Sequence, residues 1–260
     1  GLNNATAEQL RALSTEEILA LENNYLLDGI ITRDGEYVPT SIAEAFQAGR
    51  VNGERLGIGN VQNEGSFFAA LTESAAGKPM DEVAYRDNLE ALEKQYALPG
   101  FADKVMQEYP ASDYGSPAEA YAQVITDSWF AAPIYRIADS LDNQIKVYYY
   151  EFSDPTCPKY VTTDFAQGTA HTYELPYLFP GFHGSSDLST DLNKKQQKVA
   201  KEMVKLWTGM SEVDRRGIWE RFNSDRAQYL KLGQGKPQMM DMKDYRERHH
   251  FDFWQNIRLY

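Results

Sequence analysis

The sequence has very little cysteine, since Cys157 is the only one among its 260 residues. A single cysteine cannot form a disulfide within the chain, so no internal covalent cross-link holds the fold together. Basic residues are also few: 26 lysines and arginines stand against 38 aspartates and glutamates, which gives a formal net charge of -12. Because a sequence-independent nucleic-acid binder needs a basic face for the phosphates, this charge balance argues against a nucleic-acid partner.

The sequence also lacks a long hydrophobic run. No stretch approaches the roughly 20 apolar residues that a helix needs to cross a bilayer, so we expect no membrane span. The first ten residues, GLNNATAEQL, lack the basic, apolar and small-residue order of a signal peptide. The natural start of the protein is not evident from these residues, which leaves both a cytoplasmic and a secreted location open.

Helical and strand-like segments alternate along the chain. Amphipathic spacing and capping residues predict helices, and these cover residues 81–96, 101–109, 117–142 with an interruption at Pro133, and 193–208. Apolar and aromatic runs predict strands, which begin at residue 54 in ERLGIGN, span 143–153 in NQIKVYYYEFS and close the chain at 249–257 in HHFDFWQNI. The second of these strands has almost no polar face, which is typical of a strand covered on both sides. Strands that alternate with helices predict the α/β class.

His171 is the first candidate for chemistry, in the stretch QGTAHTYELPYLFPG at 167–181. A lone histidine is more often a structural or surface residue than a catalyst, because histidine has many roles. A metal site is not expected. His171 and Glu174 have a turn-sized spacing without an evident third ligand, and the adjacent His249 and His250 would point to opposite faces of a strand.

Glu64 is the second candidate, in the stretch GNVQNEGSFF at 59–68. It follows an apolar strand, and open α/β sheets have their sites just past the carboxyl ends of strands. The alternative is a solvated carboxylate in a turn. Together the two residues suggest the acid–histidine pair of a hydrolase. A histidine that acts as a base in a hydrolase needs a buried carboxylate on its Nδ1–H. An acid that precedes the histidine also fits the chain order of α/β-hydrolases.

Six segments, in order along the chain, resemble the type B carboxylesterases and cholinesterases. They are LRALSTEEIL, DGEYVPTSIAEAFQAGR, the acid segment GNVQNEGSFF, the helix and strand TDSWFAAPIYRIADSL with IKVYYYEF, the histidine segment GTAHTYELPYLF, and FDFW. Two departures stand out. Thr172 occupies a position where many members have glycine, and TGMSEVDRRG replaces a Gly-Asp-Pro-Asn stretch of the family.

The resemblance implies an α/β-hydrolase fold without a cofactor, and it implies roles for particular residues. Glu64 would orient and polarise His171, and His171 would move the proton of a serine. Glu174 would support the site from behind the histidine, or be an ordinary buried polar residue. Phe67 and Phe68 would line the pocket for an ester with an apolar group, or belong to the core. If so, a Glu64 carboxylate oxygen should lie about 2.6–3.2 Å from His171 Nδ1.

The sequence contains no G-x-S-x-G motif, which carries the nucleophile in this family. Residues 1–260 are therefore interpreted as the C-terminal part of one α/β-hydrolase domain that needs an N-terminal half for its serine and oxyanion hole. We expect the chain alone to be inactive and to pair with that half or to self-associate. The alternative is a non-catalytic, cholinesterase-like adhesion or binding module, since some members have an incomplete triad.

Overall fold

The computed structural model describes residues 5–18, 20, 33–159, 161–184, 187–213 and 217–257. The chain divides into two compact units, Gly1–Ala45 and Phe46–Tyr260. In the first unit, helix α1 (Ala7–Arg11) begins with a capping box, in which Thr6 and Gln9 satisfy each other's backbone N–H groups. Helix α3 (Ile42–Gln47) spans the boundary. The second unit contains the sheet and the candidate site.

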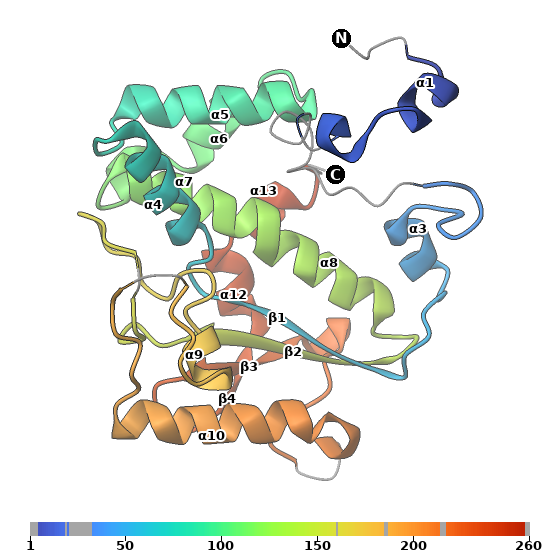
Figure 1. Cartoon of the computed structure of the whole chain (residues 1–260). Coiled ribbons are helices and arrows are strands. Elements are labelled where there is room, and N and C mark those ends of the chain that lie inside the picture. Colours follow the sequence, from blue (N-terminus) through green and yellow to red (C-terminus); the bar gives the residue numbers. More distant parts are fainter. Residues whose placement is uncertain are drawn as a thin grey trace. The chain divides into compact units, whose positions relative to one another are not determined.

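Four strands form one sheet in the order β1–β2–β3–β4 (Figure 1). Their bounds are Arg55–Val61 for β1, Lys146–Ser153 for β2, Gln228–Gly233 for β3 and Gln238–Asp241 for β4. The first three strands are parallel, and β4 is antiparallel to β3. In the first pair Val61 lies opposite Phe152, so β1 and β2 end at the same edge of the sheet. The segments that follow these two strands start from that edge.

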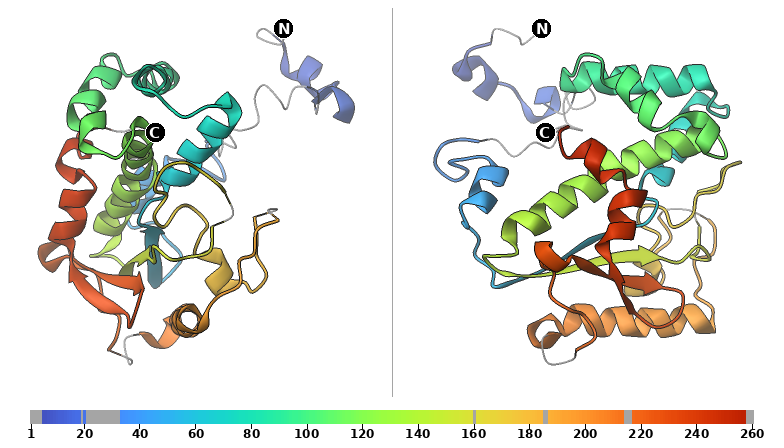
Figure 2. Two further views of the ribbon diagram at one scale, coloured as in Figure 1. Left: turned by 90° about the vertical axis from the view of Figure 1, so that its left-hand side faces the viewer. Right: turned by 180° about the vertical axis from the view of Figure 1, so that it is seen from behind.

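Helices cover both faces of the sheet, as Figures 1 and 2 show. Those whose side chains join the core on the first face are α4 (Gly65–Ala76), α5 (Glu82–Tyr96), α6 (Phe101–Glu108), α7 (Pro117–Ile125), α8 (Ala132–Leu141), α12 (Met242–Arg248) and α13 (Phe251–Trp254). On the second face are α9 (Leu175–Leu178) and α10 (Lys194–Thr208). Strand β2 shows this two-sided cover directly, because the adjacent Tyr148 and Tyr149 are both buried, one in each core.

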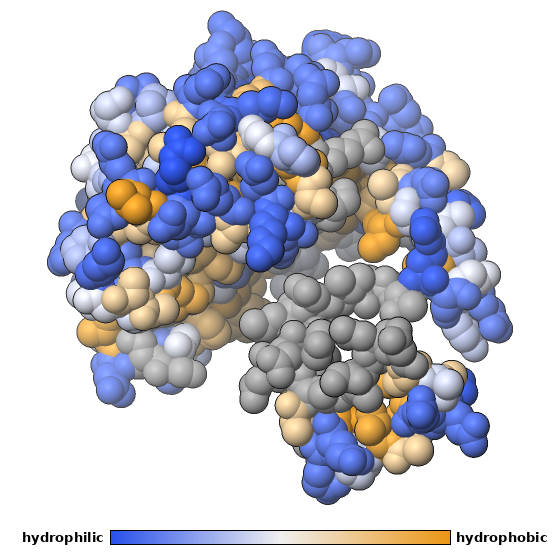
Figure 3. Space-filling model, turned by 90° about the horizontal axis from the view of Figure 1, so that it is seen from above, coloured by the Kyte–Doolittle hydropathy of each residue, from blue (hydrophilic) through white to orange (hydrophobic). Residues whose placement is uncertain are grey.

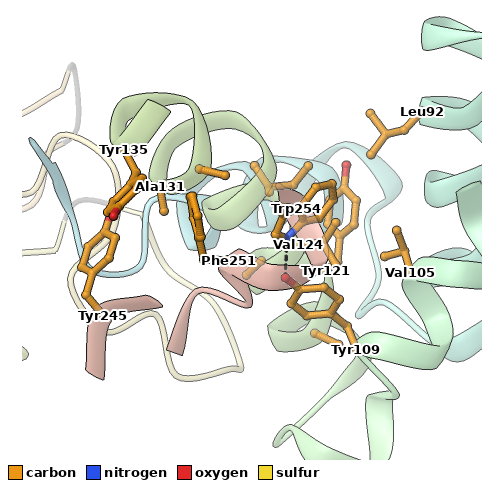
Figure 4. Close-up of a cluster of buried hydrophobic side chains, with 14 of the residues drawn as sticks. Leu92, Val105, Tyr109, Tyr121, Val124, Ala131, Tyr135, Tyr245, Phe251 and Trp254 are labelled. Atoms are coloured by element: carbon orange, nitrogen blue, oxygen red, sulfur yellow. Dashed lines mark hydrogen bonds between the residues drawn. The ribbon is translucent and has the colours of Figure 1, made fainter. Parts of the chain in front are cut away.

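The core on the first face is rich in aromatic side chains (Figure 4). Trp254 in α13 donates its indole N–H to the hydroxyl of Tyr109, which directly follows α6. The rings of Tyr135 in α8 and Phe251 in α13 lie 4.3 Å apart between centroids. Because aromatic side chains bury large areas, these contacts fix the last two helices firmly to the middle of the chain.

The predicted helices over 81–96, 101–109 and 193–208 correspond to α5, α6 and α10 within a residue or two. The predicted strand at 249–257 is wrong, because helix α13 lies within this segment and helix α12 ends just before it. Phe251 and Trp254 are both buried and stand three residues apart, which is the spacing of one helix face rather than of a strand. Strands β3 and β4 were not predicted from the sequence.

The predicted helical stretch 117–142 is continuous but changes its winding in the middle. A π-helical turn, Thr126–Ala131, joins α7 to α8, and Pro133 lies in the first turn of α8. A proline lacks the N–H that an α-helix needs, so a change of pattern just before it is expected. Within the turn, the hydroxyl of Thr126 donates to the carbonyl of Ala122 at 2.8 Å, a side-chain bond that accompanies helix distortion.

The surface agrees with the acidic, polar composition. The face shown in Figure 3 is mostly hydrophilic, with small and separate hydrophobic spots. In the part of the chain that the structure describes, no helix is long and apolar enough to cross a membrane.

The crossing of α4 and α7 leads to the first prediction. A Cβ atom on Gly65 would lie 1.9 Å from the carbonyl oxygen of Ala122 and 2.8 Å from the backbone nitrogen of Thr126. Since both atoms are backbone, Gly65→Ala must push the helices apart, and we expect a loss of about 1–3 kcal/mol in the free energy of unfolding. Urea unfolding measures this loss.

Gly53→Ala is the matched control, because its new Cβ would meet nothing closer than the carbonyl oxygen of Arg55 at 3.7 Å. An equal unfolding midpoint for the two variants would show that the helix crossing is not tight.

Candidate active site

The site lies at the carboxyl edge of the sheet, where β1 ends. Glu64 stands three residues after Val61, at the position that precedes α4, and its side chain turns back toward the strand. Its Oε1 accepts a hydrogen bond from the backbone N–H of Val61 at 2.9 Å, and the residue is only 5% exposed. The first residue of α4 is held in place as well, because the N–H of Gly65 donates to Thr126 Oγ1 at 2.9 Å. The carboxylate therefore has a fixed direction.

The loop with His171 is bound to the same edge by backbone hydrogen bonds. The N–H of Asn63 donates to the carbonyl of Thr169 at 2.9 Å, and the N–H of Thr169 donates to Asn63 Oδ1 at 3.0 Å. Gly168 has a φ of 58°, and a Cβ on it would lie 2.2 Å from Asn63 Oδ1, so only glycine fits this approach. The residue next to Glu64 therefore positions the loop that carries His171.

The backbone conformation of Thr172 accounts for the glycine that many members of the resembled family have at this position. Its φ is 69°, in the left-handed region that glycine enters freely and that a β-branched residue enters at a cost of about 1–2 kcal/mol. The hydroxyl of Thr172 donates to the carbonyl of His171. The departure from the family pattern therefore affects backbone strain beside the histidine, rather than packing alone.

Glu64 and His171 meet as the sequence predicts. Glu64 Oε2 and His171 Nδ1 are 2.6 Å apart, although 107 positions separate the two residues. The side chain of Glu64 is 7% exposed and that of His171 is 34% exposed. With Nδ1–H donating to the carboxylate, Nε2 is the nitrogen with a lone pair for a proton. Burial lowers the pKa of His171, but the hydrogen bond and charge of Glu64 outweigh it and hold the pKa above the usual histidine value.

Aromatic rings surround the imidazole of His171. The ring centroids of Phe67, Phe68 and Phe130 lie 5.9, 5.2 and 5.3 Å from it. Trp129 stands behind Phe68, with its ring centroid 5.4 Å away. Phe67 and Phe68 therefore lie beside the histidine. The sequence did not identify Trp129 or Phe130 as site residues, because both belong to the π-helical turn.

Glu174 lies next to this pair, in the same loop as the histidine. Burial raises its pKa to about 7, and the negative charge of Glu64 adds to that shift. Within the described residues, Oε2 of Glu174 is buried without a hydrogen-bond partner. A carboxyl group in such surroundings favours its neutral form.

The other histidines are not part of this site. His249 is buried and lies against Asp127 and Glu151, and His250 pairs with Glu108 at 2.6 Å. No local sequence pattern indicates these pairs, since each joins segments that are about 100 positions or more apart. Across the described ranges, no group of three or more histidine, cysteine, aspartate or glutamate side chains has an arrangement that could hold a metal ion.

Comparison with known proteins yields one family. The sequence model of the carboxylesterase family matches residues 2–254. Cocaine esterase of Homo sapiens is 26% identical over 239 residues, and acylcarnitine hydrolase of Mus musculus is 24% identical over 241; each match covers 86% of this chain and 41% of the relative. Acetylcholinesterase of Bungarus fasciatus is 22% identical over 220 residues. The chain thus spans less than half the length of these relatives.

Among solved structures, a PNB esterase has a TM-score of 0.64 and 16% identity, over 93% of this chain and 50% of that chain. A thermophilic PNB esterase has a TM-score of 0.65, 17% identity and the same coverage. This likeness, with the mostly parallel sheet between helices, confirms the predicted α/β-hydrolase fold.

The contact between Glu64 and His171 predicts a change in proton affinity. Glu64→Gln keeps a hydrogen-bonding side chain but removes the negative charge that raises the pKa of His171, so this pKa should fall. Proton NMR of the imidazole Cε1–H during a pH titration measures it. The imidazole of the exposed His183 is an internal reference, and a His171 pKa that stays the same would show that Glu64 does not stabilise the imidazolium.

The buried Glu174 predicts how stability depends on pH. Burial raises its pKa from the ordinary 4.5 to about 7 in the folded state, so the folded state holds the proton more tightly than the unfolded chain between these values. Stability should therefore fall as the pH rises from about 4.5 to about 7. Glu174→Gln removes this fall, which amounts to a few kcal/mol at most, since a tenfold change in proton affinity corresponds to about 1.4 kcal/mol.

Urea unfolding at several pH values tests this, with Glu220→Gln on the surface as the control. A parallel pH profile for wild type and Glu174→Gln would contradict the assignment of a neutral, buried Glu174.

Proposed function

The chain belongs to the carboxylesterase family, and from this membership we propose that it supplies the acid and the base of a serine carboxylesterase. The observation that supports the proposal is the 2.6 Å contact between Glu64 and His171 at the carboxyl edge of a parallel sheet. A carboxylate on Nδ1 and a partly exposed imidazole are what general base catalysis by a histidine requires.

In the proposed reaction, His171 Nε2 takes the proton of a serine hydroxyl while the serine oxygen attacks the ester carbonyl. Glu64 stabilises the imidazolium that forms. His171 then gives the proton to the alcohol oxygen, the ester C–O bond breaks, and an acyl-serine remains. Water repeats the sequence: His171 takes its proton, the hydroxyl oxygen attacks the acyl carbon, and the returning proton restores the serine. Such proton transfers contribute about 10²–10⁴-fold each.

The proposed substrates are carboxylic esters with an apolar group. Phe67 and Phe68 support this, because their rings lie beside His171 and would contact whatever part of the ester lies there. The relatives' names refer to cocaine, acylcarnitine and acetylcholine, which differ in their chemistry, so the proposal stops at the class of ester. Glu174, neutral and close to the pair, is proposed to support the site without touching the substrate.

The serine and the oxyanion hole are proposed to come from an N-terminal half, with residues 1–260 as the C-terminal part of one α/β-hydrolase domain. The free side of β1 supports this. Among the described strands, β1 pairs only with β2, so no described strand lies along its outer edge. Such an edge pairs readily with another strand, either from that half or from a second copy of the chain.

The experiment compares the chain alone with the chain co-expressed with its N-terminal half, using hydrolysis of 4-nitrophenyl butyrate. The chain alone should show only background hydrolysis. The pair should be active, and His171→Ala should reduce kcat by about 10³-fold or more, as other triad substitutions do. His183→Ala, at an exposed histidine of the next loop, is the matched control and should keep its activity.

Two outcomes would contradict the proposal. Hydrolysis by the chain alone that His171→Ala abolishes would mean that the nucleophile is within residues 1–260. A stable pair without hydrolysis would favour the non-catalytic binding module.

A further inference from the structure

The π-helical turn Thr126–Ala131 has one side at the candidate site and another in the core. Phe130 lies beside His171, with 5.3 Å between the ring centroids. Asp127, three residues earlier, is fully buried and contacts His249. In an α-helix, residues three apart share a face, whereas the wider π turn rotates them further from each other. The turn thus connects a ring at the site to a charge in the core.

Asp127 belongs to a buried ionic cluster with Glu151, Arg248 and His249. Asp127 Oδ1 lies 2.5 Å from His249 Nδ1, and Glu151 Oε1 lies 3.2 Å from His249 Nε2. Arg248 forms two hydrogen bonds to Glu151, at 2.6 and 3.2 Å. The two carboxylates are 0% exposed and His249 is 1% exposed.

Charge balance in this cluster favours a protonated His249, although Arg248 Nη1 also lies 3.0 Å from its Nε2. Two carboxylates and one guanidinium leave a negative charge, and an imidazolium brings the sum to zero, as buried charges require. Burial lowers the pKa of His249, but Asp127 and Glu151 outweigh it and hold the pKa above its usual range. His249 therefore connects the π turn, through Asp127, to strand β2, through Glu151.

The other bonds to Asp127 come from the same core. The hydroxyl of Tyr109 donates to Oδ2 and the amide of Gln123 donates to Oδ1, both at 2.8 Å. One residue before Asp127, Thr126 accepts the N–H of Gly65 at the start of α4, next to Glu64. The turn is thus held on one side by the ionic cluster and on the other by the segment that carries the candidate acid.

We propose that His249 is a positioning residue and Phe130 a specificity-determining residue: the ionic cluster holds the π turn so that Phe130 forms a wall for the apolar group of the ester. This inference rests on the proposed function. It assigns substrate selectivity to residues other than Glu64, His171, Phe67 and Phe68. The carboxylates of the cluster act on the substrate only through the turn.

The test uses the chain co-expressed with its N-terminal half and two substrates, 4-nitrophenyl acetate and 4-nitrophenyl hexanoate. The main variant is Asp127→Asn/His249→Asn, which removes one charge of each sign and leaves Glu151 with Arg248. The ratio of kcat/KM for hexanoate to that for acetate should fall by at least about threefold, since the longer acyl group gains its extra binding from apolar walls. Phe130→Ala should lower the same ratio.

The matched control is His250→Asn. His250 is adjacent, also pairs with a carboxylate, and has a φ of 45° that asparagine tolerates. It should leave the ratio unchanged, whereas a merely structural role for His249 would lower both kcat/KM values equally. If circular dichroism shows that the double variant does not fold, Gln123→Leu replaces it in the same assay. This variant removes one hydrogen bond to Asp127 and keeps all four charges of the cluster. A smaller fall in the ratio is then expected.

Proton NMR of the 260-residue chain gives a second readout that needs no activity. The Cε1–H signal of His171 depends on the ring current of Phe130, so it should move in the double variant and not in His250→Asn. Hydrolysis and signal position that both match wild type in the folded variants would overturn the inference. A pair without any hydrolysis, combined with a moved signal, would instead reject the proposed function and keep the positioning role.

Discussion

The parallel pairing of β1 with β2 is the constraint on which the candidate site depends. Because Val61 lies opposite Phe152, the segments that follow both strands start at the same edge, and Glu64 is three residues from that point. One backbone hydrogen bond and one side-chain hydrogen bond between Asn63 and Thr169 then place the loop that carries His171 beside Glu64. The acid–histidine contact is thus the product of strand register, and a shift of one residue would turn each side chain to the opposite face.

Much of this could be predicted from the sequence, and the rest depends on contacts that no local pattern contains. Glu64 could be predicted because it directly follows a recognisable buried strand, and His171 because its segment resembles the histidine segment of the family. The segment 249–257 was misassigned because closely spaced aromatic residues suit a strand as well as a short helix, and burial of Phe251 and Trp254 decides between them. Phe130 was missed because its approach to His171 depends on the winding of a π turn.

Two of the carboxylate–histidine pairs in the described residues have opposite character. In the first, His171 is 34% exposed and Nδ1 alone contacts a carboxylate, which suits a group that exchanges protons. In the second, His249 is 1% exposed and both ring nitrogens face carboxylates, which suits a fixed charge. The same two residue types thus form either a partly exposed pair or a buried ionic link between segments. Solvent access and the number of acidic neighbours distinguish the two.

The backbone at Thr172 is strained, but its side chain limits the conformations of the loop that carries His171. A glycine at this position would relieve the left-handed strain, but it would also let the loop sample many other backbone conformations. A β-branched threonine whose hydroxyl is bonded to the carbonyl of His171 narrows that range. The strain is therefore the energetic cost of preorganisation, because the loop that carries the imidazole is held in a narrower range of conformations.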